Sequence, residues 1–287
     1  MLVSTIKTSL DYEVFSASEF FLNMLVSKKS QLILQESLKV EYVNHDGTRA
    51  AVNFQKNIDA VGGRFASFMA EEGTVSVDYT ARVVTNNDRR PDQAAIYSIG
   101  RLPKKTIPCL RPSRYCESDV LSSEVQSLFC AQGDGIALVE SIIDWIQENI
   151  QYEVGYSDST TSAWDVFEKR KGVCRDFAHL GITFCRALNI PARFCVGYVY
   201  FDEPPQDFHA IFEAYLGGRW IKFDPTRLVP PDNLVVIARG NDAKDTPFAT
   251  IFGNIRTTRM RINIGQEDPY SDFRVTAGDE QAAIIGR

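Results

Sequence analysis

The chain has 287 residues, of which 44% are hydrophobic and 24% charged, a composition typical of globular proteins with a sizeable core. Its formal net charge is −6, so no broad basic field is available to attract nucleic-acid phosphates or anionic lipid. No apolar run approaches the roughly 18 residues of a membrane span, and the first thirty residues lack an export signal. We therefore expect a cytoplasmic protein that acts without nucleic acid or a membrane.

The first hundred residues read as short β segments. Alternating and β-branched runs predict strands at 38–43, 51–54 and 74–79, and Asp46-Gly47 is typical of a turn. Residues 18–27 fit either a short helix or an edge strand. The pattern predicts an N-terminal domain, residues 1–100, built as an antiparallel β-sandwich.

Three prolines mark the next segment. Pro103, Pro108 and Pro112 exclude a regular helix and favour an extended connection. We expect a linker at 101–118 and a second domain at 119–287.

Helix signals begin after this linker. Asp134 is placed to cap a helix whose apolar side chains recur at steps of three and four, at 139, 142, 143, 146 and 150. Ser162 and Asp165 resemble a capping box, which predicts a short helix over 163–170 that Gly172 ends.

A further helix is expected to start near Cys174, because apolar side chains form one stripe from there to Leu188. Residues 189–191 end it, and 193–200 have the β-branched and aromatic content of a strand. The runs 209–216 and 219–224 flank Gly217-Gly218, so they predict a hairpin with a primed two-residue turn.

The turn length sets the register of this hairpin. It places Leu216 opposite Arg219 and then, further along the strands, Glu213 opposite Lys222 and Tyr215 opposite Trp220. In that register His209 and Asp224 point to the same face as diagonal neighbours, close enough for their side chains to touch.

Cys174, His209 and Asp224 supply the parts of cysteine acyl-transfer chemistry. The free amides and dipole at a helix start favour a thiolate at Cys174. A carboxylate at Asp224 would fix the tautomer of His209 and leave its other nitrogen for the thiol. We expect an ion pair between Cys174 and His209, with the Cys174 amide donating to the oxyanion.

Other reactive side chains are assigned structural roles. We expect packing roles for five further cysteines, at 109, 116, 130, 185 and 195, and structural or solvent roles for His45 and His179. Tyr152 and Trp164 are possible oxyanion donors, but helical spacing with Phe167 favours core packing. Arg175 and Asp176 either tune the site or face solvent, and Arg193 is expected to form an ion pair. Three histidines without Cys-x-x-Cys spacing do not support a zinc site, so no metal or cofactor is expected.

Several ordered motifs carry a family resemblance, strongest over residues 135–255. They are Gly172-Val173-Cys174-Arg175-Asp176-Phe177-Ala178, Asn189-Ile190-Pro191-Ala192-Arg193, Gly197-Tyr198, Asp207-Phe208-His209-Ala210 and Trp220-Ile221-Lys222-Phe223-Asp224-Pro225-Thr226. The sequence resembles the bacterial transglutaminase-like proteins of the papain-like superfamily, which are described as cysteine proteases. The resemblance implies an α+β core in which a helix bearing the cysteine packs on an antiparallel sheet. It also implies Cys174 as nucleophile, His209 as base and Asp224 as orienting acid.

We therefore expect a cysteine-dependent enzyme that breaks an amide bond through a thioester. Hydrolysis of a peptide or protein amide is favoured, because water is always available whereas amine transfer needs a site that excludes it. Two alternatives stay open: a cross-linking transglutaminase that transfers the acyl group to an amine, and a non-catalytic interaction module that retains the fold. No calcium-binding loop is present, and the sequence leaves the oligomeric state open.

Overall fold

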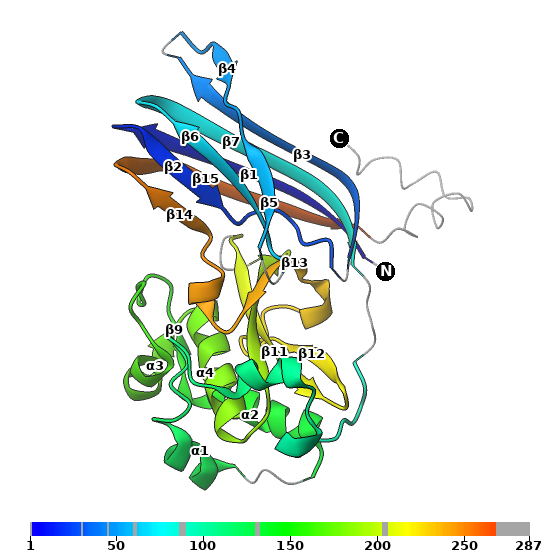
Figure 1. Cartoon of the computed structure of the whole chain (residues 1–287). Helices are drawn as coiled ribbons and strands as arrows, with labels where there is room; N and C mark the ends of the chain where they lie inside the picture. The colour runs from blue at the N-terminus through cyan, green and yellow to red at the C-terminus, as the bar shows by residue number, and fades with distance from the viewer. Residues whose placement is uncertain are drawn as a thin grey trace, which may run out of the picture.

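A computed structural model describes residues 2–29, 31–44, 46–59, 62–85, 90–129, 133–202 and 206–267. A layered β structure lies above a part that carries the helices (Figure 1). The fold is α+β with antiparallel main sheets, which confirms the predicted fold class.

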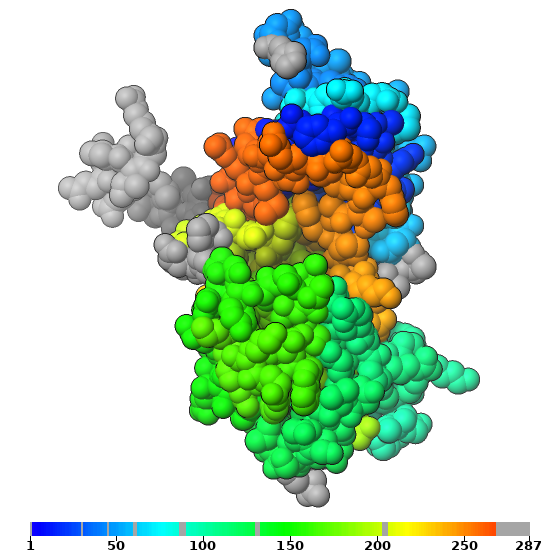
Figure 2. Space-filling view, turned by 90° about the vertical axis from the view of Figure 1, so that its left-hand side faces the viewer, coloured from blue at the N-terminus to red at the C-terminus, as the bar shows by residue number. Residues whose placement is uncertain are grey.

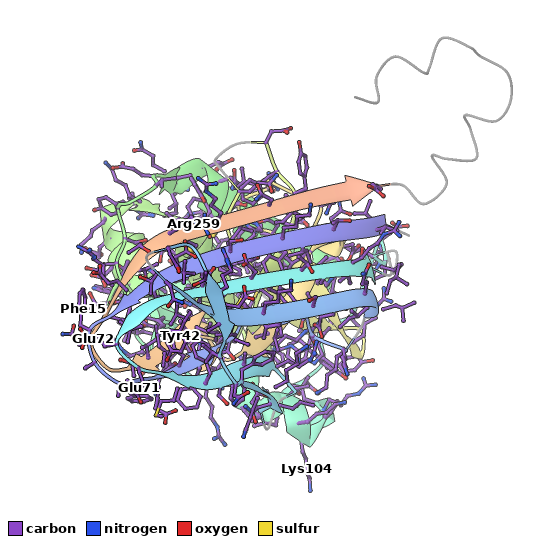
Figure 3. All side chains as sticks on the ribbon, turned by 90° about the horizontal axis from the view of Figure 1, so that it is seen from above. Phe15, Tyr42, Glu71, Glu72, Lys104 and Arg259 are labelled. Carbon is purple, nitrogen blue, oxygen red and sulfur yellow. The ribbon has the colours of Figure 1, made fainter. Side chains whose placement is uncertain are left out.

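The upper part consists of two antiparallel sheets. One sheet has the order β15(Ile255–Glu267), β1(Leu2–Val14), β7(Gly73–Thr85), β3(Gln31–Val43) and β4(Arg49–Ala51). The other has the order β14(Ala249–Phe252), β2(Ser18–Leu22), β6(Arg64–Ala70) and β5(Gln55–Ile58). Seen from above, the strands of the first sheet run side by side across the molecule (Figure 3).

Buried and exposed side chains alternate along the strands, which explains how the two sheets enclose a core. In β1 the even-numbered residues from Ile6 to Val14 are buried, while the odd-numbered ones are more exposed. Phe20 of β2 stacks on Phe68 of β6 with ring centroids 4.7 Å apart inside this core. Residues 18–22 are thus a strand, whereas 52–54 of the predicted strand 51–54 lie between β4 and β5.

Two strands of the sandwich come from the far end of the chain. Strand β15 pairs with β1 along its whole length, and β14 pairs with β2. In the space-filling view, these orange strands lie beside blue β1 on the upper part (Figure 2). Residues 249–267 therefore belong to the sandwich, although the sequence placed all of 119–287 in the second domain.

The connection between the two parts contains short helical turns and is not extended. Residues Ile99–Arg101 and Lys104–Leu110 form 3₁₀ turns, η1 and η2, with Pro108 inside the second. The prolines exclude an α-helix, as predicted, but short 3₁₀ turns tolerate them. The expectation of an extended linker was wrong for this reason.

The lower part places helices on one face of a four-stranded antiparallel sheet. The sheet has the order β12(Arg219–Phe223), β11(His209–Leu216), β10(Ala192–Tyr198) and β13(Val235–Gly240). The helices are α1(Ser122–Leu128), α2(Gly135–Asn149), α3(Ala163–Lys169) and α4(Cys174–Ala187), with short turns η3(Pro231–Asn233) and η4(Ala243–Asp245). Helix α4 packs on β11 so closely that a Cβ at Gly181 would come within 2.7 Å of the Phe212 ring.

The predicted hairpin register is confirmed. Leu216 pairs with Arg219, Tyr215 with Trp220 and Glu213 with Lys222. Both turn glycines have positive φ, 56° and 85°, as a primed turn requires.

The two parts share side chains at their junction. Tyr198 at the end of β10 inserts into the sandwich core, where its hydroxyl donates to the carbonyl of Met24 at 2.8 Å. Its ring stacks on Tyr79 of β7. The lower sheet is therefore anchored directly in the sandwich.

Buried Arg186 of α4 ties the connector to the lower sheet. Its guanidinium donates to the carbonyls of Ala192, Arg111 and Asn241 and to the hydroxyl of Ser113, at 2.6–3.1 Å. These contacts satisfy a side chain that is only 3% exposed.

Candidate active site

Cys174 is the first residue of α4, and the chain leading to it is fixed by a short β pairing. Helix α3 ends at Lys169, and its C-cap residue Arg170 adopts a left-handed conformation with φ 61°. Strand β9(Lys171–Gly172) then pairs in parallel with β8(Gln151–Tyr152). The predicted stop at Gly172 was wrong, because Arg170 itself takes the left-handed position.

Gly172 is required for a different reason. A Cβ at this position would come within 2.8 Å of the Asp176 Cβ. The glycine therefore leaves room for the Asp176 side chain at the start of α4.

Asp176 holds the first turn of α4. Its fully buried carboxylate accepts from the Val173 N–H at 2.9 Å and from the Arg175 guanidinium at 2.8 and 3.0 Å. Arg175 in turn donates to the carbonyl of Asp158 at 2.6 Å. Asp176 satisfies an amide at the helix start, and its negative charge also matches the helix dipole there. Both residues thus support the turn that carries Cys174.

His209 and Asp224 meet across the hairpin in a buried contact. His209 Nε2 lies 3.1 Å from Asp224 Oδ2, and the two residues are only 1% and 4% exposed. The other carboxylate oxygen accepts from the Thr226 N–H and hydroxyl at 2.9 and 2.7 Å. Asp224 therefore both forms the turn before Thr226 and orients the imidazole.

Cys174 lies near His209 and affects the pKa of its imidazole. Burial by itself would lower the pKa of His209, but hydrogen bonds with Asp224 and Cys174 outweigh it and raise that pKa to about 10. Because Nε2 faces Asp224, Nδ1 is the nitrogen left for the thiol. The arrangement favours an imidazolium, which is the partner that a thiolate needs.

Tyr152 also reaches Cys174. Burial first, and then the neighbouring Cys174, raise the pKa of Tyr152, so its hydroxyl lies close to the cysteine. Trp164, the other aromatic considered as an oxyanion donor, packs against Phe167 and is 38% exposed. Tyr152 is therefore the aromatic hydroxyl at this site.

The remaining sequence expectations divide into confirmed and untested ones. Asp134 caps α2, Ser162 and Asp165 form a capping box, and Arg193 forms an ion pair with Glu213. Cys116, Cys185 and Cys195 are buried and Cys109 is partly exposed. Cys130 and His45 lie outside the described residues.

His179 has a structural role within α4. Its ring is fully buried, stacks on Tyr115 and accepts from the Ala243 N–H at 3.1 Å. Burial first, and then Arg175 and Arg186, lower the pKa of His179. It is therefore neutral at pH 7 and supports the packing of α4.

The sequence left the roles of two residues at the site open. Asp176 stands three residues after the N-cap Val173, a helix-start signal that was available. Tyr152 is brought to Cys174 by a two-residue parallel pairing of β8 with β9, too short to leave a sequence pattern.

Comparison with known proteins places this geometry in a family. Residues 126–225 match the model of the transglutaminase-like superfamily. The crystal structure of a putative cysteine protease from Cytophaga hutchinsonii is 40% identical, with a TM-score of 0.83 over 93% of this chain and 91% of that one. The chain belongs to the transglutaminase-like superfamily. This membership supports thiol-dependent catalysis in general terms.

Mycobacterial proteins are similar to this chain at lower sequence identity. An uncharacterized protein of Mycobacterium leprae is 26% identical over 165 residues, which is 53% of this chain and 58% of the relative. An uncharacterized protein of Mycobacterium tuberculosis is 27% identical over 126 residues, or 39% and 40% of the two chains. The chain thus spans about half the length of these curated relatives.

Two kinds of feature are absent from the described ranges. No helix there combines the length and apolar character needed to cross a membrane. Within the same residues, no group of three or more histidine, cysteine, aspartate or glutamate side chains is arranged to hold a metal ion.

Proposed function

We propose that this transglutaminase-like chain transfers acyl groups from amide bonds through a thioester on Cys174. The main support is His209, whose buried ring contacts the Asp224 carboxylate and lies near enough to Cys174 for that thiol to raise its pKa. Such a placement lets one imidazole nitrogen be oriented while the other exchanges a proton with the nucleophile.

In the proposed reaction, the Cys174 sulfur attacks the amide carbonyl carbon. His209 holds the thiol proton and delivers it to the leaving amine as the carbon–nitrogen bond breaks, which produces a thioester and a free amine. The oxyanion that forms on the way accepts from the Cys174 N–H and the Tyr152 hydroxyl. The Asp224 carboxylate stabilises the imidazolium through its contact with Nε2.

We propose water as the acceptor that resolves the thioester, which makes the chain an amide hydrolase acting on a peptide or protein. Water attacks the thioester carbon, His209 takes one of its protons, and the thiolate leaves as the carboxylic acid is released. Transfer to an amine, as in a cross-linking transglutaminase, is the second candidate, because the same thioester accepts either nucleophile.

The first test measures how fast each cysteine reacts with iodoacetamide across a pH series, read out by peptide mass spectrometry. We expect Cys174 to react quickly well below pH 7 and to lose that advantage in His209→Ala. Cys109 is the internal control, because burial raises the pKa of this partly exposed thiol. A Cys174 that reacts like Cys109 and ignores His209 would refute the activated nucleophile.

The second test separates the proposed outcomes with a library of peptide amides in ¹⁸O-labelled water, with and without a small primary amine. Hydrolysis places ¹⁸O in the product acid, whereas transferase activity yields the amine adduct in preference to the acid. Cys174→Ala should abolish both products. Reactive Cys174 without either product would favour the non-catalytic interaction module.

A further inference from the structure

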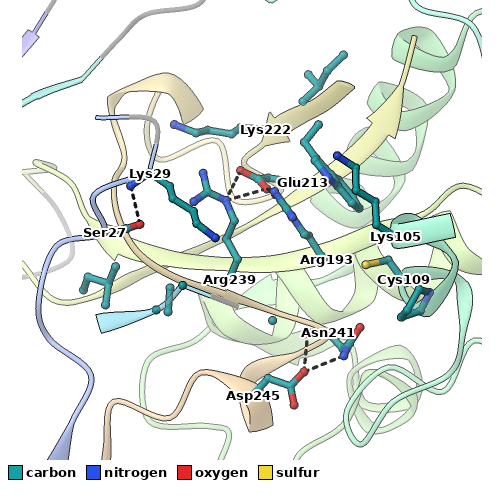
Figure 4. Close-up of a pocket in the computed structure, with 18 of the residues that line it drawn as sticks. Ser27, Lys29, Lys105, Cys109, Arg193, Glu213, Lys222, Arg239, Asn241 and Asp245 are labelled. Atoms are coloured by element: carbon teal, nitrogen blue, oxygen red, sulfur yellow. Dashed lines mark hydrogen bonds and ion pairs between the residues drawn. The ribbon is translucent and has the colours of Figure 1, made fainter. Parts of the chain in front are cut away.

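A large cavity lies where the two parts of the molecule and the connector meet. Its volume is about 940 Å³, within the range of small-molecule sites. Its walls include Ser27 and Lys29 before β3, Gly62 and Gly63 before β6, Lys105 and Cys109 in η2, and part of the lower sheet. Figure 4 shows these segments around the space.

The cavity lies on the face of the hairpin that points away from α4. Glu213, Trp220 and Lys222 line it, whereas the alternate residues Phe212 and Ala214 face the core beneath α4. Cys174, His209 and Asp224 are not among its lining residues. The cavity is therefore separate from the site proposed for acyl transfer.

The residues that line this cavity are mainly cationic, although the chain as a whole carries a negative net charge. Seven lysine and arginine residues line it against four aspartate and glutamate residues, in a chain of formal net charge −6. The seven are Lys29, Arg90, Lys105, Arg193, Arg219, Lys222 and Arg239. A partly enclosed space of this kind concentrates positive potential.

The carboxylates among these lining residues are already engaged, and Asp59 accepts from the Gly63 N–H at 2.7 Å. Glu213 is 2% exposed and accepts from Arg193 at 2.7 Å and from Arg239 at 3.0 and 3.1 Å. Asp245 accepts from the backbone and side-chain amides of Asn241, each at 2.9 Å. These carboxylates therefore have hydrogen-bond partners nearby, and Lys105 and Lys222 of the cavity lining keep their positive charge unneutralised by them.

Glu213 and Trp220 also fix the arginines of the inner wall. The Arg193 guanidinium lies 4.0 Å from the centre of the Trp220 ring while its nitrogens bind Glu213. In Figure 4 the side chains of Arg193 and Arg239 converge on Glu213. Guanidinium groups held in this way need little ordering when they bind an anion.

Lys222 and Lys105 are the lining cations that are not engaged by other side chains of the described residues. Lys222 stands opposite Glu213 in the hairpin, yet the Glu213 carboxylate is taken by the two arginines. Neither lysine forms an ion pair or hydrogen bond with the part of the chain that the structure describes. Each is therefore available to a ligand.

We propose that this cavity binds a small molecule carrying two or more negative charges on phosphate or carboxylate groups. Such a ligand would form charge-assisted hydrogen bonds with the lysines and the fixed arginine wall. It would also touch the sandwich, the connector and the lower sheet together, so bound ligand should stabilise the whole chain.

The experiment measures binding of inorganic pyrophosphate and of citrate by titration calorimetry at an ionic strength of about 0.15 M, which screens exposed charges. The protein is the full chain with Cys174→Ala, so any hydrolytic activity is removed and the result does not depend on the proposed function. We expect saturable one-to-one binding of at least one anion. The tighter of the two shows whether phosphate or carboxylate is the recognised group.

Two double lysine variants test whether the anion binds in this cavity. Lys105→Gln with Lys222→Gln should weaken binding at least about tenfold, since each removes a charge-assisted contact. Lys7→Gln with Lys39→Gln removes the same charge from exposed positions on β1 and β3 and should change affinity less than about twofold. Equal urea midpoints for the two double variants show that folding is intact.

Two results would overturn the proposal. One is the absence of saturable binding for both anions in the parent chain. The other is equal loss of affinity in the two double variants, which would mean attraction to overall charge and not to this cavity.

Discussion

At the scale of single residues, the site depends on carboxylates that are already satisfied before any substrate arrives. Asp224 is held by Thr226 and the Val229 N–H, at 2.7–3.2 Å, and so presents a fixed oxygen to His209. Asp176 is held by the Val173 N–H and the Arg175 guanidinium at the start of α4. Preorganised acceptors of this kind avoid a reorganisation cost during reaction.

Replacing Asp224 by asparagine tests the orientation of His209. The amide has the same shape but no charge, so burial should again dominate and the pKa of His209 should fall from about 10. The imidazolium would then lose its proton at lower pH. We expect alkylation of Cys174 at pH 7 to slow at least about tenfold, with the fast acidic plateau lost from the pH profile. An unchanged profile would contradict the role of Asp224.

Tyr152→Phe separates oxyanion stabilisation from activation of the thiol. Alkylation by iodoacetamide forms no oxyanion, whereas attack on an amide does. We therefore expect amide turnover to fall about 100-fold while the alkylation rate of Cys174 changes little. Equal losses in both assays would mean that Tyr152 acts on the thiol and not on the oxyanion.

Asp176→Asn tests how much the buried Asp176–Arg175 ion pair stabilises the start of α4. Asp165, at the equivalent position of α3, is the comparison. Asp176→Asn leaves the Arg175 guanidinium without its carboxylate and should lower the free energy of unfolding by about 2–3 kcal/mol. Asp165→Asn, at the same helix position in α3 but partly exposed, should cost about 0.5–1 kcal/mol. Urea unfolding of both variants measures the difference, and equal costs would argue against the buried pair.

At the scale of elements, the hairpin β11–β12 carries two of the three proposed catalytic side chains. Its turn fixes the register, and the register in turn places His209 beside Asp224. Geometry at Gly217-Gly218 therefore matters to a site at the other end of the strands.

Gly218→Ala tests this dependence. A side chain at φ 85° is strained, so we expect a loss of about 1–2 kcal/mol in the free energy of unfolding. Gly100→Ala in η1 is the control, since an added Cβ meets nothing within 4 Å and φ is not positive there. It should change stability by less than about 0.5 kcal/mol in the same urea titration. A Gly218→Ala protein as stable as the control would contradict the strained turn.

Local elements were the part of the fold that sequence reasoning predicted best. A two-residue glycine turn leaves one register for its strands, and Asp134 and Ser162 mark helix starts by their own side-chain chemistry. Cys174, His209 and Asp224 were found because each lies at the end of such an element. Tyr152 could be named only as one of two possible oxyanion donors, because its pairing depends on tertiary contacts between segments too short to show periodicity.

At the scale of the whole molecule, the sandwich is completed by strands from both ends of the described chain. Strand β15 was not predicted because most of its residues are exposed and only Ile262 and Ile264 are buried. Such a strand has little hydrophobic alternation, and its identity comes from pairing with β1.

Ile264→Asp tests whether β15 is part of the sandwich core. A carboxylate at this 4% exposed position would be buried without a partner and should cost about 3–5 kcal/mol. Met260→Asp on the same strand is the control, since Met260 is 47% exposed and the substitution should cost less than about 1 kcal/mol. Urea unfolding followed by circular dichroism compares them, and equal stability would place β15 outside the core.

The pairing of β1 with β15 also constrains the order of assembly. Val3 lies opposite Glu267, so this edge closes a loop that contains the entire lower part. During synthesis β1 can pair with β7 early, but its other edge stays open until β15 emerges. Closing such a long loop is slow, and an open edge can pair with other chains. In pulsed hydrogen exchange during refolding, the β1 amides that face β15 should gain protection after those that face β7.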